Sequence, residues 1–553
     1  QQGMLFHTLY EPEEGTYIGQ LGSDFNAVLD LDAFQRAWEA VVRRHGTLRT
    51  GFQWQGVEEP LQHVRGFSEA LRAEVRVEDL RQLSVEEQQQ RVAAILEEDR
   101  HRGFDLERPP LVRFMALRLG EERLRLVWSF HQLILDGWSL PVLLQDFFTA
   151  YQQGVSGGSP ALPPAPSYRE YVAWLERQDL AAAETFWRRE LAGFEEPTAV
   201  AFDRAAGTER RHREIARPLS RELTSELEAF ARRQRLTLNT LVEGAWSLLL
   251  GRGAGAADVL FGVVVSGRPP ELAGVDEMVG LLINTLPVRV RIPGGMSVES
   301  WLAGLQLHQA ELRQYEYSPL ADVQRWSGVE LAQGQSLFDT FMVFQNYPEE
   351  DEGGAAKVLR SGDPGVPEEG ELQLGTLEAE ERSTYALTLV ANPGPELELV
   401  LENDASRFDA TTVERQLRQL ENLLTGMATA PEAKLEDLSL LSPAEAHQLR
   451  VEWRSPAAAA EPETFSLHAL VAAQAERTPD APAVLCGGTL LPYAELQRRA
   501  GALARELSEA GVGPETVVGL SVEKGADLVV GLLGILQAGG AYLPLDPAYP
   551  AER

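Results

Sequence analysis

The stretch SFHQLILDGWSL, residues 129 to 140, combines polar side chains that could take part in acyl transfer. His131 and Gln132 stand side by side, and Asp136 and Gly137 follow three apolar residues. An imidazole can accept a proton near neutral pH, whereas a glutamine amide only donates and accepts hydrogen bonds. These residue types are compatible with acyl transfer, and Gln132 can form hydrogen bonds but cannot act as a base.

A strand before this stretch and a helix after it are predicted to position these side chains. Large apolar residues alternate along 124–130, as on one face of a strand. Apolar residues then recur at helical spacing from 140 to 151, and Ser139 and Pro141 suit the first turn of that helix. The candidate site should therefore lie in a loop between a strand and a helix.

Breaks in composition predict how the chain is divided. Two lobes that alternate helices and strands, 1–167 (with a truncated start) and 168–445, meet at the Gly-, Ser- and Pro-rich end of the first. A linker at 446–463, clearest where Ala and Pro accumulate, separates them from a partial domain at 464–553. The acidic, Gly- and Pro-containing segment 349–371 is predicted to be a long loop.

The composition limits the partners and the cellular setting. Acidic residues number 83 and basic residues 50, and the net charge of -33 repels phosphate backbones and anionic lipid surfaces. We therefore expect no nucleic acid and no membrane as partners. The single cysteine, Cys486, can form neither an internal disulfide nor a cysteine-rich zinc site, which fits a reducing, cytoplasmic location. We expect Cys486 to be a small buried residue.

The HQLILDG segment resembles the HHxxxDG motif of nonribosomal peptide synthetase condensation domains at every defining position except the second His, where Gln132 stands. Other segments resemble further motifs of that family in the same order: QQGMLFHTLY, RRHGTLRTGF, SYREYVAW, GLLINTLPVRV, YEYSPL and LFDTFMVFQNYP. Together they cover roughly residues 1–445. Ordered agreement of many motifs is much more specific than one short match.

The C-terminal part resembles a different domain of the same enzymes. LPYAELQRRAGALARELSEAGV and LQAGGAYLPLDPAYPAER are similar to the first two core motifs of an adenylation domain. The nucleotide loop and substrate pocket of that domain would lie beyond residue 553, so this chain should not activate an amino acid. The order of domains favours a condensation domain over an epimerisation domain, and the motifs are most similar to those of the subtype that joins two L-configured residues.

The resemblance implies an α/β fold like that of chloramphenicol acetyltransferase, with two lobes in a V and a central tunnel. Upstream donor and downstream acceptor carrier proteins would dock at opposite mouths, and the chain's own adenylation domain would be a further partner. Phosphopantetheine arms would enter as substrates, with no intrinsically bound cofactor and no metal. The implied activity is peptide-bond formation in antibiotic biosynthesis.

The resemblance also implies roles for individual residues. Gln132 occupies the place of the histidine that serves as a base or orients the amine, so condensation should be impaired or absent. We expect His131 to hold the loop, and Asp136 to pair with Arg268 in a structural role. Gly137 has two equally supported interpretations, a simple turn or a backbone donor to the oxyanion.

The resemblance also implies places for other residues near the motif. Trp138 is expected to pack beneath the loop. Asn284 and Ser266 are candidates for the tunnel wall, although Asn284 could equally cap its own strand. The predicted N-terminal helix opens with Asp32 as its N-cap, and three arginines lie beside it: Arg43, Arg44 and Arg49. They could attract the phosphate of a phosphopantetheine arm, but we expect them to be solvated.

Two other functions remain possible on the sequence alone. A catalytically silent module that docks and gates carrier proteins is the main alternative, and Gln132 is the feature that supports it. A standalone acetyltransferase-like enzyme that uses coenzyme A is weakened by the adenylation motifs after residue 464. The identity of the donor and acceptor amino acids cannot be inferred from these motifs.

Overall fold

A computed structural model of the chain shows two compact units, Gln1–Ser442 and Pro443–Arg553, which are described separately. The predicted loop at 349–371 and the linker segment 454–463 lie outside the residues that the structure describes. The described residues are 1–10, 17–25, 29–57, 59–68, 71–72, 74–205, 211–331, 335–345, 377–380, 385–453 and 466–547.

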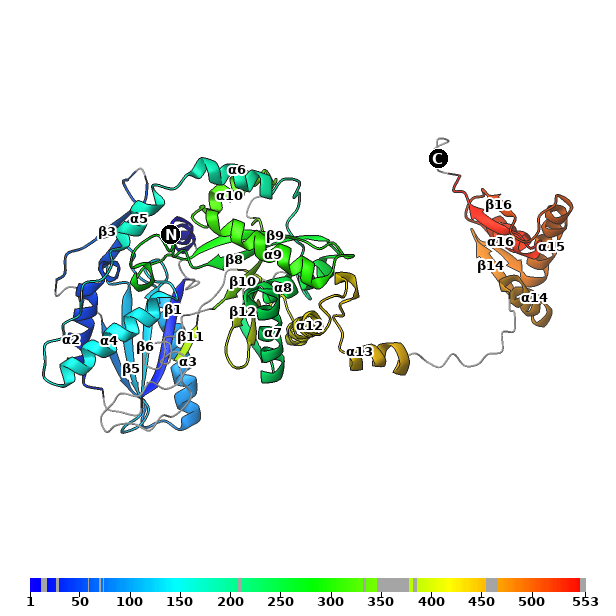
Figure 1. The fold of residues 1–553 in the computed structure, drawn as a ribbon. Helices are drawn as coiled ribbons and strands as arrows, with labels where there is room; N and C mark the ends of the chain where they lie inside the picture. The colour runs from blue at the N-terminus through cyan, green and yellow to red at the C-terminus, as the bar shows by residue number, and fades with distance from the viewer. Residues whose placement is uncertain are drawn as a thin grey trace. The chain divides into compact units, whose positions relative to one another are not determined.

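The first sheet has five strands in the order β11-β1-β6-β5-β4. Helices α2 and α4 lie on one face of it and α3 on the other (Figure 1). Strand β6 runs antiparallel to both β1 and β5, whereas β4 and β5 are parallel. The bounds are β1 Ile18–Phe25, β4 Val75–Asp79, β5 Val112–Arg118, β6 Leu124–His131, β11 Leu377–Glu380, α2 Leu31–Arg44, α3 Val85–Arg102 and α4 Ser139–Val155.

Alternation along the strands explains why this sheet is covered on both faces. Phe114 and Trp128 pack with the apolar faces of α2 and α4, whereas Met115 and Val127 pack against α3. Further short elements complete this half: α1 Gln2–Tyr10 and the hairpin of β2 Thr50–Gln53 and β3 Leu61–Val64. Two helices follow in the sequence, α5 Tyr168–Leu175 and α6 Leu180–Glu190, and α6 packs in the core of the second sheet.

The N-cap of α2 differs from the prediction. Asp30, not Asp32, accepts hydrogen bonds from the backbone N–H groups of Asp32 and Ala33, both at 3.0 Å. The helix begins at Leu31, so Asp32 lies in its first turn, where a carboxylate still stabilises the positive end of the helix dipole. The prediction of Asp32 as the N-cap was therefore wrong by two residues.

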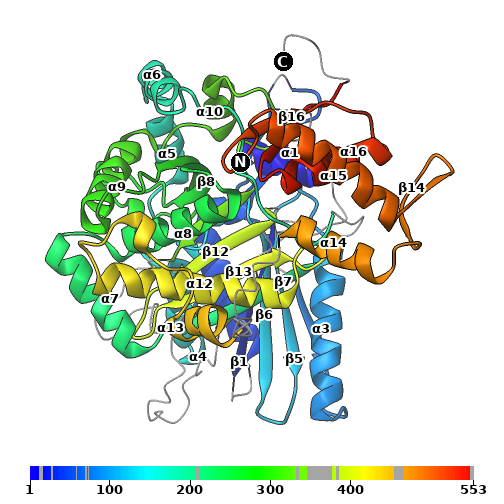
Figure 2. The ribbon, with the colours of Figure 1, turned by 90° about the vertical axis from the view of Figure 1, so that its right-hand side faces the viewer.

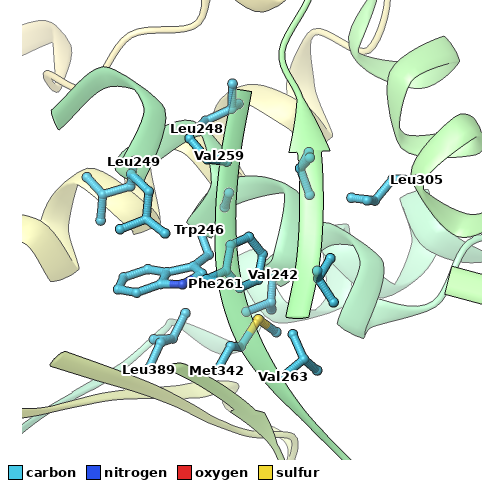
Figure 3. Packing of buried hydrophobic residues seen from close by; sticks show 14 of the residues in the cluster. Val242, Trp246, Leu248, Leu249, Val259, Phe261, Val263, Leu305, Met342 and Leu389 are labelled. Carbon is cyan, nitrogen blue, oxygen red and sulfur yellow. The ribbon is translucent and has the colours of Figure 1, made fainter. Parts of the chain in front are cut away.

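The second sheet has six strands in the order β7-β13-β12-β10-β8-β9. Figure 3 shows Trp246 and Phe261 packed with Met342 and Leu389 in its core, and α12 lies along β13 and β7 (Figure 2). The bounds are β7 His212–Pro218, β8 Asp258–Val265, β9 Asn284–Arg291, β10 Thr340–Phe344, β12 Leu387–Asn392, β13 Glu398–Asp404, α7 Arg221–Gln234, α8 Leu238–Ala254, α9 Val298–Leu312, α10 Leu320–Ser327 and α12 Ala410–Thr429.

The two sheets exchange segments. Strand β11 lies between β10 and β12 in the sequence, yet it pairs with β1 of the first sheet, with Gln20 opposite Glu380. Val279, from the segment between β8 and β9, is buried in the core of the first sheet. Residues 167 and 168 lie between the strands of the first sheet and those of the second, apart from β11. The division into two lobes stays a prediction.

The second unit begins with helical residues, α13 Pro443–His447 and a π-helical turn at Gln448–Glu452. The remaining elements are α14 Leu467–Arg477, the hairpin of β14 Pro482–Cys486 and β15 Thr489–Pro492, α15 Tyr493–Glu509, β16 Val517–Leu520, α16 Ala526–Gln537 and β17 Ala541–Pro544. Cys486 is exposed, so its predicted burial was wrong. It ends β14, whose partner in the described residues is β15 alone, and this two-stranded hairpin leaves the thiol uncovered.

Candidate active site at the loop between β6 and α4

The loop that bears the motif is anchored by its apolar residues. Leu133, Ile134 and Leu135 are completely buried in the core of the first sheet. The backbone N–H of Gln132 donates to Tyr17 O at 2.8 Å, which fixes the start of the loop beside β1. Because its apolar residues are buried in the core, the loop holds its polar residues in fixed positions.

Both ring nitrogens of His131 are engaged. Nδ1 accepts a hydrogen bond from the Leu133 N–H at 3.1 Å, so the proton of the neutral ring lies on Nε2. Nε2 reaches Thr8 Oγ1 at 3.4 Å, and the Thr8 hydroxyl in turn donates to Met4 O at 2.8 Å. Burial lowers the pKa of His131 to about 4. His131 is thus a neutral ring that ties the loop to α1.

We expect His131 to remain neutral throughout the physiological pH range. Its ring ¹H and ¹⁵N chemical shifts should stay constant from pH 8 to pH 5, because protonation would place a charge in an apolar site. Since the pKa of an unfolded histidine is about 6.5, the folded chain should lose stability as the pH falls below that value. The urea-unfolded chain is the control. Titration of the native ring near pH 6.5 would contradict the assignment.

Asp136 is saturated with hydrogen-bond donors. Its two carboxylate oxygens accept from Arg268 Nη1 at 3.0 Å and Nη2 at 3.1 Å, in the bidentate arrangement. The N–H and hydroxyl of Ser139 lie 2.9 and 2.7 Å from Oδ1. The N–H groups of Leu282 and Ile283 reach Oδ2 at 3.0 and 3.3 Å. The carboxylate therefore cannot accept a further hydrogen bond from Gln132 or from a reactant.

These bonds join the motif loop to the segment between β8 and β9. The N–H of Asp136 donates to Gly280 O at 3.2 Å, and Ser139 Oγ accepts from the Gly280 N–H at 3.0 Å. Thr47, which follows α2, donates its hydroxyl to Val279 O at 2.7 Å. The Asp136–Arg268 pair therefore lies where the segments of the two sheets meet, with the side chains 0% and 3% exposed.

Gly267 is required for the placement of Arg268. Its φ is +59°, and a Cβ added there would lie 1.8 Å from the Leu282 carbonyl oxygen. We expect Gly267→Ala to lower the free energy of unfolding by about 2 to 3 kcal/mol, from left-handed strain and overpacking. Urea unfolding followed by tryptophan fluorescence measures this loss. Gly295→Ala is the matched control, because a Cβ there meets nothing within 4 Å; equal effects of the two changes would refute the argument.

The side-chain amide of Gln132 and the backbone N–H of Gly137 have no hydrogen-bond partner among the described residues. Gln132 is half-buried, and in the described part of the chain no group forms a hydrogen bond with its side-chain amide. The N–H of Gly137 likewise has no acceptor among the described residues, and its φ is not positive. Trp138 was expected beneath the loop, and it lies half-buried with its ring 5.5 Å from Arg268 Cζ.

Trp138 and Arg268 line a cavity of about 850 Å³. Its wall follows the end of β8, from Val263 to Ser266, and includes part of α8. Ser266 therefore lies in the wall of this cavity. Asn284 is not in the described wall of this cavity. Its Nδ2 donates to Glu316 O at 2.7 Å and Ser318 O at 2.8 Å, so its side chain braces the turn before α10. A tunnel role for Ser266 or Asn284 stays a prediction.

Of the three arginines near α2, Arg43 is exposed as predicted, whereas Arg44 is not. Arg44 forms a buried ion pair with Asp146 at 2.9 Å, so the prediction was wrong for this residue. Arg43 lies 3.7 Å from the centre of the Phe67 ring, and Arg49 donates to Val42 O. The reason is that α2 packs on α4, which brings the carboxylate of Asp146 to the end of α2.

Several site residues were missed from the sequence. Ser139 was assigned only to the start of α4, although a hydroxyl three residues after Asp136 can reach back to it. Thr8 and the backbone of 280–283 contribute through contacts more than a hundred residues apart, for which the local pattern holds no signal. Glu243, completely buried in α8, also lines the cavity and was not noticed.

The described residues lack two other features. They contain no group of three or more His, Cys, Asp or Glu side chains placed to hold a metal ion. Of the helices that the structure describes, none has the length and apolar character needed to cross a membrane.

Comparison with known sequences identifies the family of this chain. Residues 1–450 match the model of the condensation domain, and residues 471–553 match that of AMP-binding enzymes. Over its whole length the chain is 43% and 44% identical to parts of two proteins of the linear gramicidin synthase of Brevibacillus parabrevis. It spans only 7% and 10% of the length of those two relatives.

Solved structures agree on the fold. The first condensation domain of the calcium-dependent antibiotic synthetase, in complex with a substrate analogue, aligns with a TM-score of 0.63 at 19% identity, covering 80% of this chain and 98% of that domain. A four-domain nonribosomal peptide synthetase bound to AMP and glycine aligns with a TM-score of 0.71 at 21% identity, covering all of this chain and 41% of that one. The predicted α/β class, with a condensation fold and part of an adenylation domain, is confirmed. The chain belongs to the condensation domain family of nonribosomal peptide synthetases, and its condensation domain is followed by the start of an AMP-binding domain.

Proposed function

We propose that this chain forms a peptide bond between a donor acyl or peptidyl thioester and an acceptor aminoacyl thioester. Phosphopantetheine arms of an upstream donor and a downstream acceptor carrier protein would bring the two thioesters to the motif loop. The observation that supports this function is the intact frame of the loop, in which Asp136 and His131 are fully bonded while Gln132 and Gly137 keep polar groups available.

The reaction has three needs at this loop. The acceptor amine must face the donor carbonyl, the tetrahedral oxyanion must be stabilised, and a proton must leave the nitrogen. The amide oxygen of Gln132 would accept a hydrogen bond from the amine and orient it, and the Gly137 N–H would donate to the oxyanion. Gln132 cannot take the proton. The rate should therefore be lower than with a histidine at this position.

The rate contributions of a positioned base and of proximity determine how much activity such a site retains. A positioned base contributes about 10²- to 10⁴-fold in rate, whereas holding two reactants together supplies roughly 7 to 11 kcal/mol. A free α-amine has a pKa of about 7.7 to 8.0, so part of it is neutral at physiological pH without any base. Slow condensation, driven by proximity, is the outcome that we propose for the chain as it stands.

The alternative is a silent module that docks and gates carrier proteins, and Gln132 is the observation that favours it. A single-turnover assay with a loaded donor carrier protein and a loaded acceptor carrier protein separates the two functions. Dipeptidyl thioester on the acceptor carrier supports the enzyme. Binding of both carriers without product, over a time that exceeds the uncatalysed reaction, supports the silent module.

A further inference from the structure

Two tyrosines of α5 hold the segment that supplies backbone donors to Asp136. Tyr168 and Tyr171 lie three residues apart, so their side chains share one face of the helix. The hydroxyl of Tyr168 donates to Leu281 O at 2.7 Å. The hydroxyl of Tyr171 donates to Leu282 O at 3.1 Å. Both bonds join residues more than a hundred positions apart, so α5 fixes the backbone between β8 and β9.

Each of these carbonyls belongs to a peptide group whose N–H donates to Asp136. The carbonyl of Leu281 and the N–H of Leu282 are the two ends of one trans peptide group, and they point in opposite directions. The N–H of Leu282 lies 3.0 Å from Asp136 Oδ2. The next peptide group repeats the arrangement, because Leu282 O accepts from Tyr171 and the Ile283 N–H lies 3.3 Å from the same carboxylate oxygen. Two successive peptide groups are therefore each bonded to a tyrosine on one side and to Asp136 on the other.

Hydrogen bonds at both ends of a buried peptide group strengthen each other. A hydroxyl that donates to the carbonyl polarises the peptide group and makes its N–H a stronger donor. Both hydroxyls stay protonated at neutral pH, because burial raises the pKa of Tyr168 and of Tyr171. The ring of Tyr171 stacks on that of Trp174, with 5.9 Å between the ring centroids. Gly280 lets the backbone approach α5 closely, since a Cβ there would overlap the ring of Tyr168.

We propose that Tyr168 and Tyr171 are positioning residues of the motif loop. Through the two peptide groups they fix the carboxylate of Asp136, and its other oxygen fixes the far end of the loop through the N–H and hydroxyl of Ser139. The loop thereby presents Gln132 to the reactants in one geometry. The consequence for condensation rests on the proposed function, whereas the positioning of the loop does not.

Hydrogen exchange of the Ser139 amide tests the positioning without any turnover. This N–H donates to Asp136, through Oδ1 at 2.9 Å and the backbone carbonyl at 3.1 Å, so it reports on Asp136 rather than on the tyrosines. Tyr168→Phe and Tyr171→Phe keep the rings and remove the hydroxyls. We expect each change to accelerate the exchange by about three- to tenfold, the equivalent of one hydrogen bond. NMR of the whole chain labelled with ¹⁵N-serine measures it.

Tyr151→Phe is the matched control. The buried hydroxyl of Tyr151 accepts from the Asp30 N–H at 3.1 Å, so this change also removes one hydrogen bond, but near the other end of α4. The exchange of the Ser139 amide should stay unchanged in this variant. The proposal would be overturned by exchange that stays equally slow in Tyr168→Phe and Tyr171→Phe, or by equal acceleration in Tyr151→Phe.

The rate of dipeptide formation shows whether the positioning serves condensation. At saturating concentrations of loaded carriers, Tyr168→Phe and Tyr171→Phe should each lower the single-turnover rate by about three- to tenfold and leave the affinity for the carriers unchanged. A general loss of stability would not produce this separation of rate from affinity. Faster exchange with an unchanged rate would overturn the role in condensation. Faster exchange in a chain that forms no dipeptide at all would refute the proposed function and leave the positioning of the loop in place.

Discussion

Asp136→Ala is expected to lower the free energy of unfolding of the Gln1–Ser442 unit by about 3 to 5 kcal/mol. The change leaves the guanidinium of Arg268 buried without its carboxylate and also removes the acceptor for the N–H groups of Ser139, Leu282 and Ile283. Urea unfolding, followed by tryptophan fluorescence, measures the loss.

Two further variants test whether burial of the unpaired charge causes this effect. The double change Asp136→Leu with Arg268→Met removes both charges and should recover part of the loss, since apolar replacements of buried pairs are often tolerated. Glu311→Ala breaks the exposed pair with Arg189 and should cost less than about 1 kcal/mol. If Asp136→Ala retained full stability but abolished dipeptide formation, the structural role of Asp136 would be wrong.

The local elements around the site could be predicted because their residues interact with near neighbours. The alternation from Leu124 and the helical spacing after Ser139 predict β6 and α4, and the structure places both there. The sequence does not determine the first residue of α2, because both Asp30 and Asp32 are good capping residues. The choice between them depends on where the helix enters the core.

Contacts between distant segments could not be read from the sequence. Strand β11 pairs with β1 across more than 350 residues, and its composition does not identify its partner. The donors that Asp136 receives from Leu282 and Ile283 are backbone groups, which every residue type possesses. The ion pair between His308 of α9 and Glu190 of α6 likewise joins residues more than a hundred positions apart.

The roles of Gln132 and Asp136 also differ in how they can be tested. Asp136 has its bonds in place before any substrate arrives, so stability reports its role. Gln132 has no side-chain hydrogen bond within the described residues, so its removal should scarcely affect folding. Only the chemical step can report what position 132 does.

Gln132→His is expected to raise the single-turnover rate of dipeptidyl thioester formation by about 10²- to 10⁴-fold, the contribution of a positioned base. The frame needed to hold that histidine is already present, because the Gln132 N–H is bonded to Tyr17 O and Asp136 fixes the far end of the loop. His131 cannot substitute, since its Nδ1 is an acceptor for Leu133 and burial keeps the pKa of its ring low.

The pH dependence and a control variant identify the mechanism of this gain. The gain should decline below about pH 6.5, where an ordinary imidazole takes up a proton and can no longer act as a base. Gln132→Ala removes the orienting amide without adding a base, so it should react more slowly than the unaltered chain. If Gln132→His gave no increase at pH 8 while both loaded carriers still bound, position 132 would not be what limits condensation, and the silent docking module would become the better account of the chain.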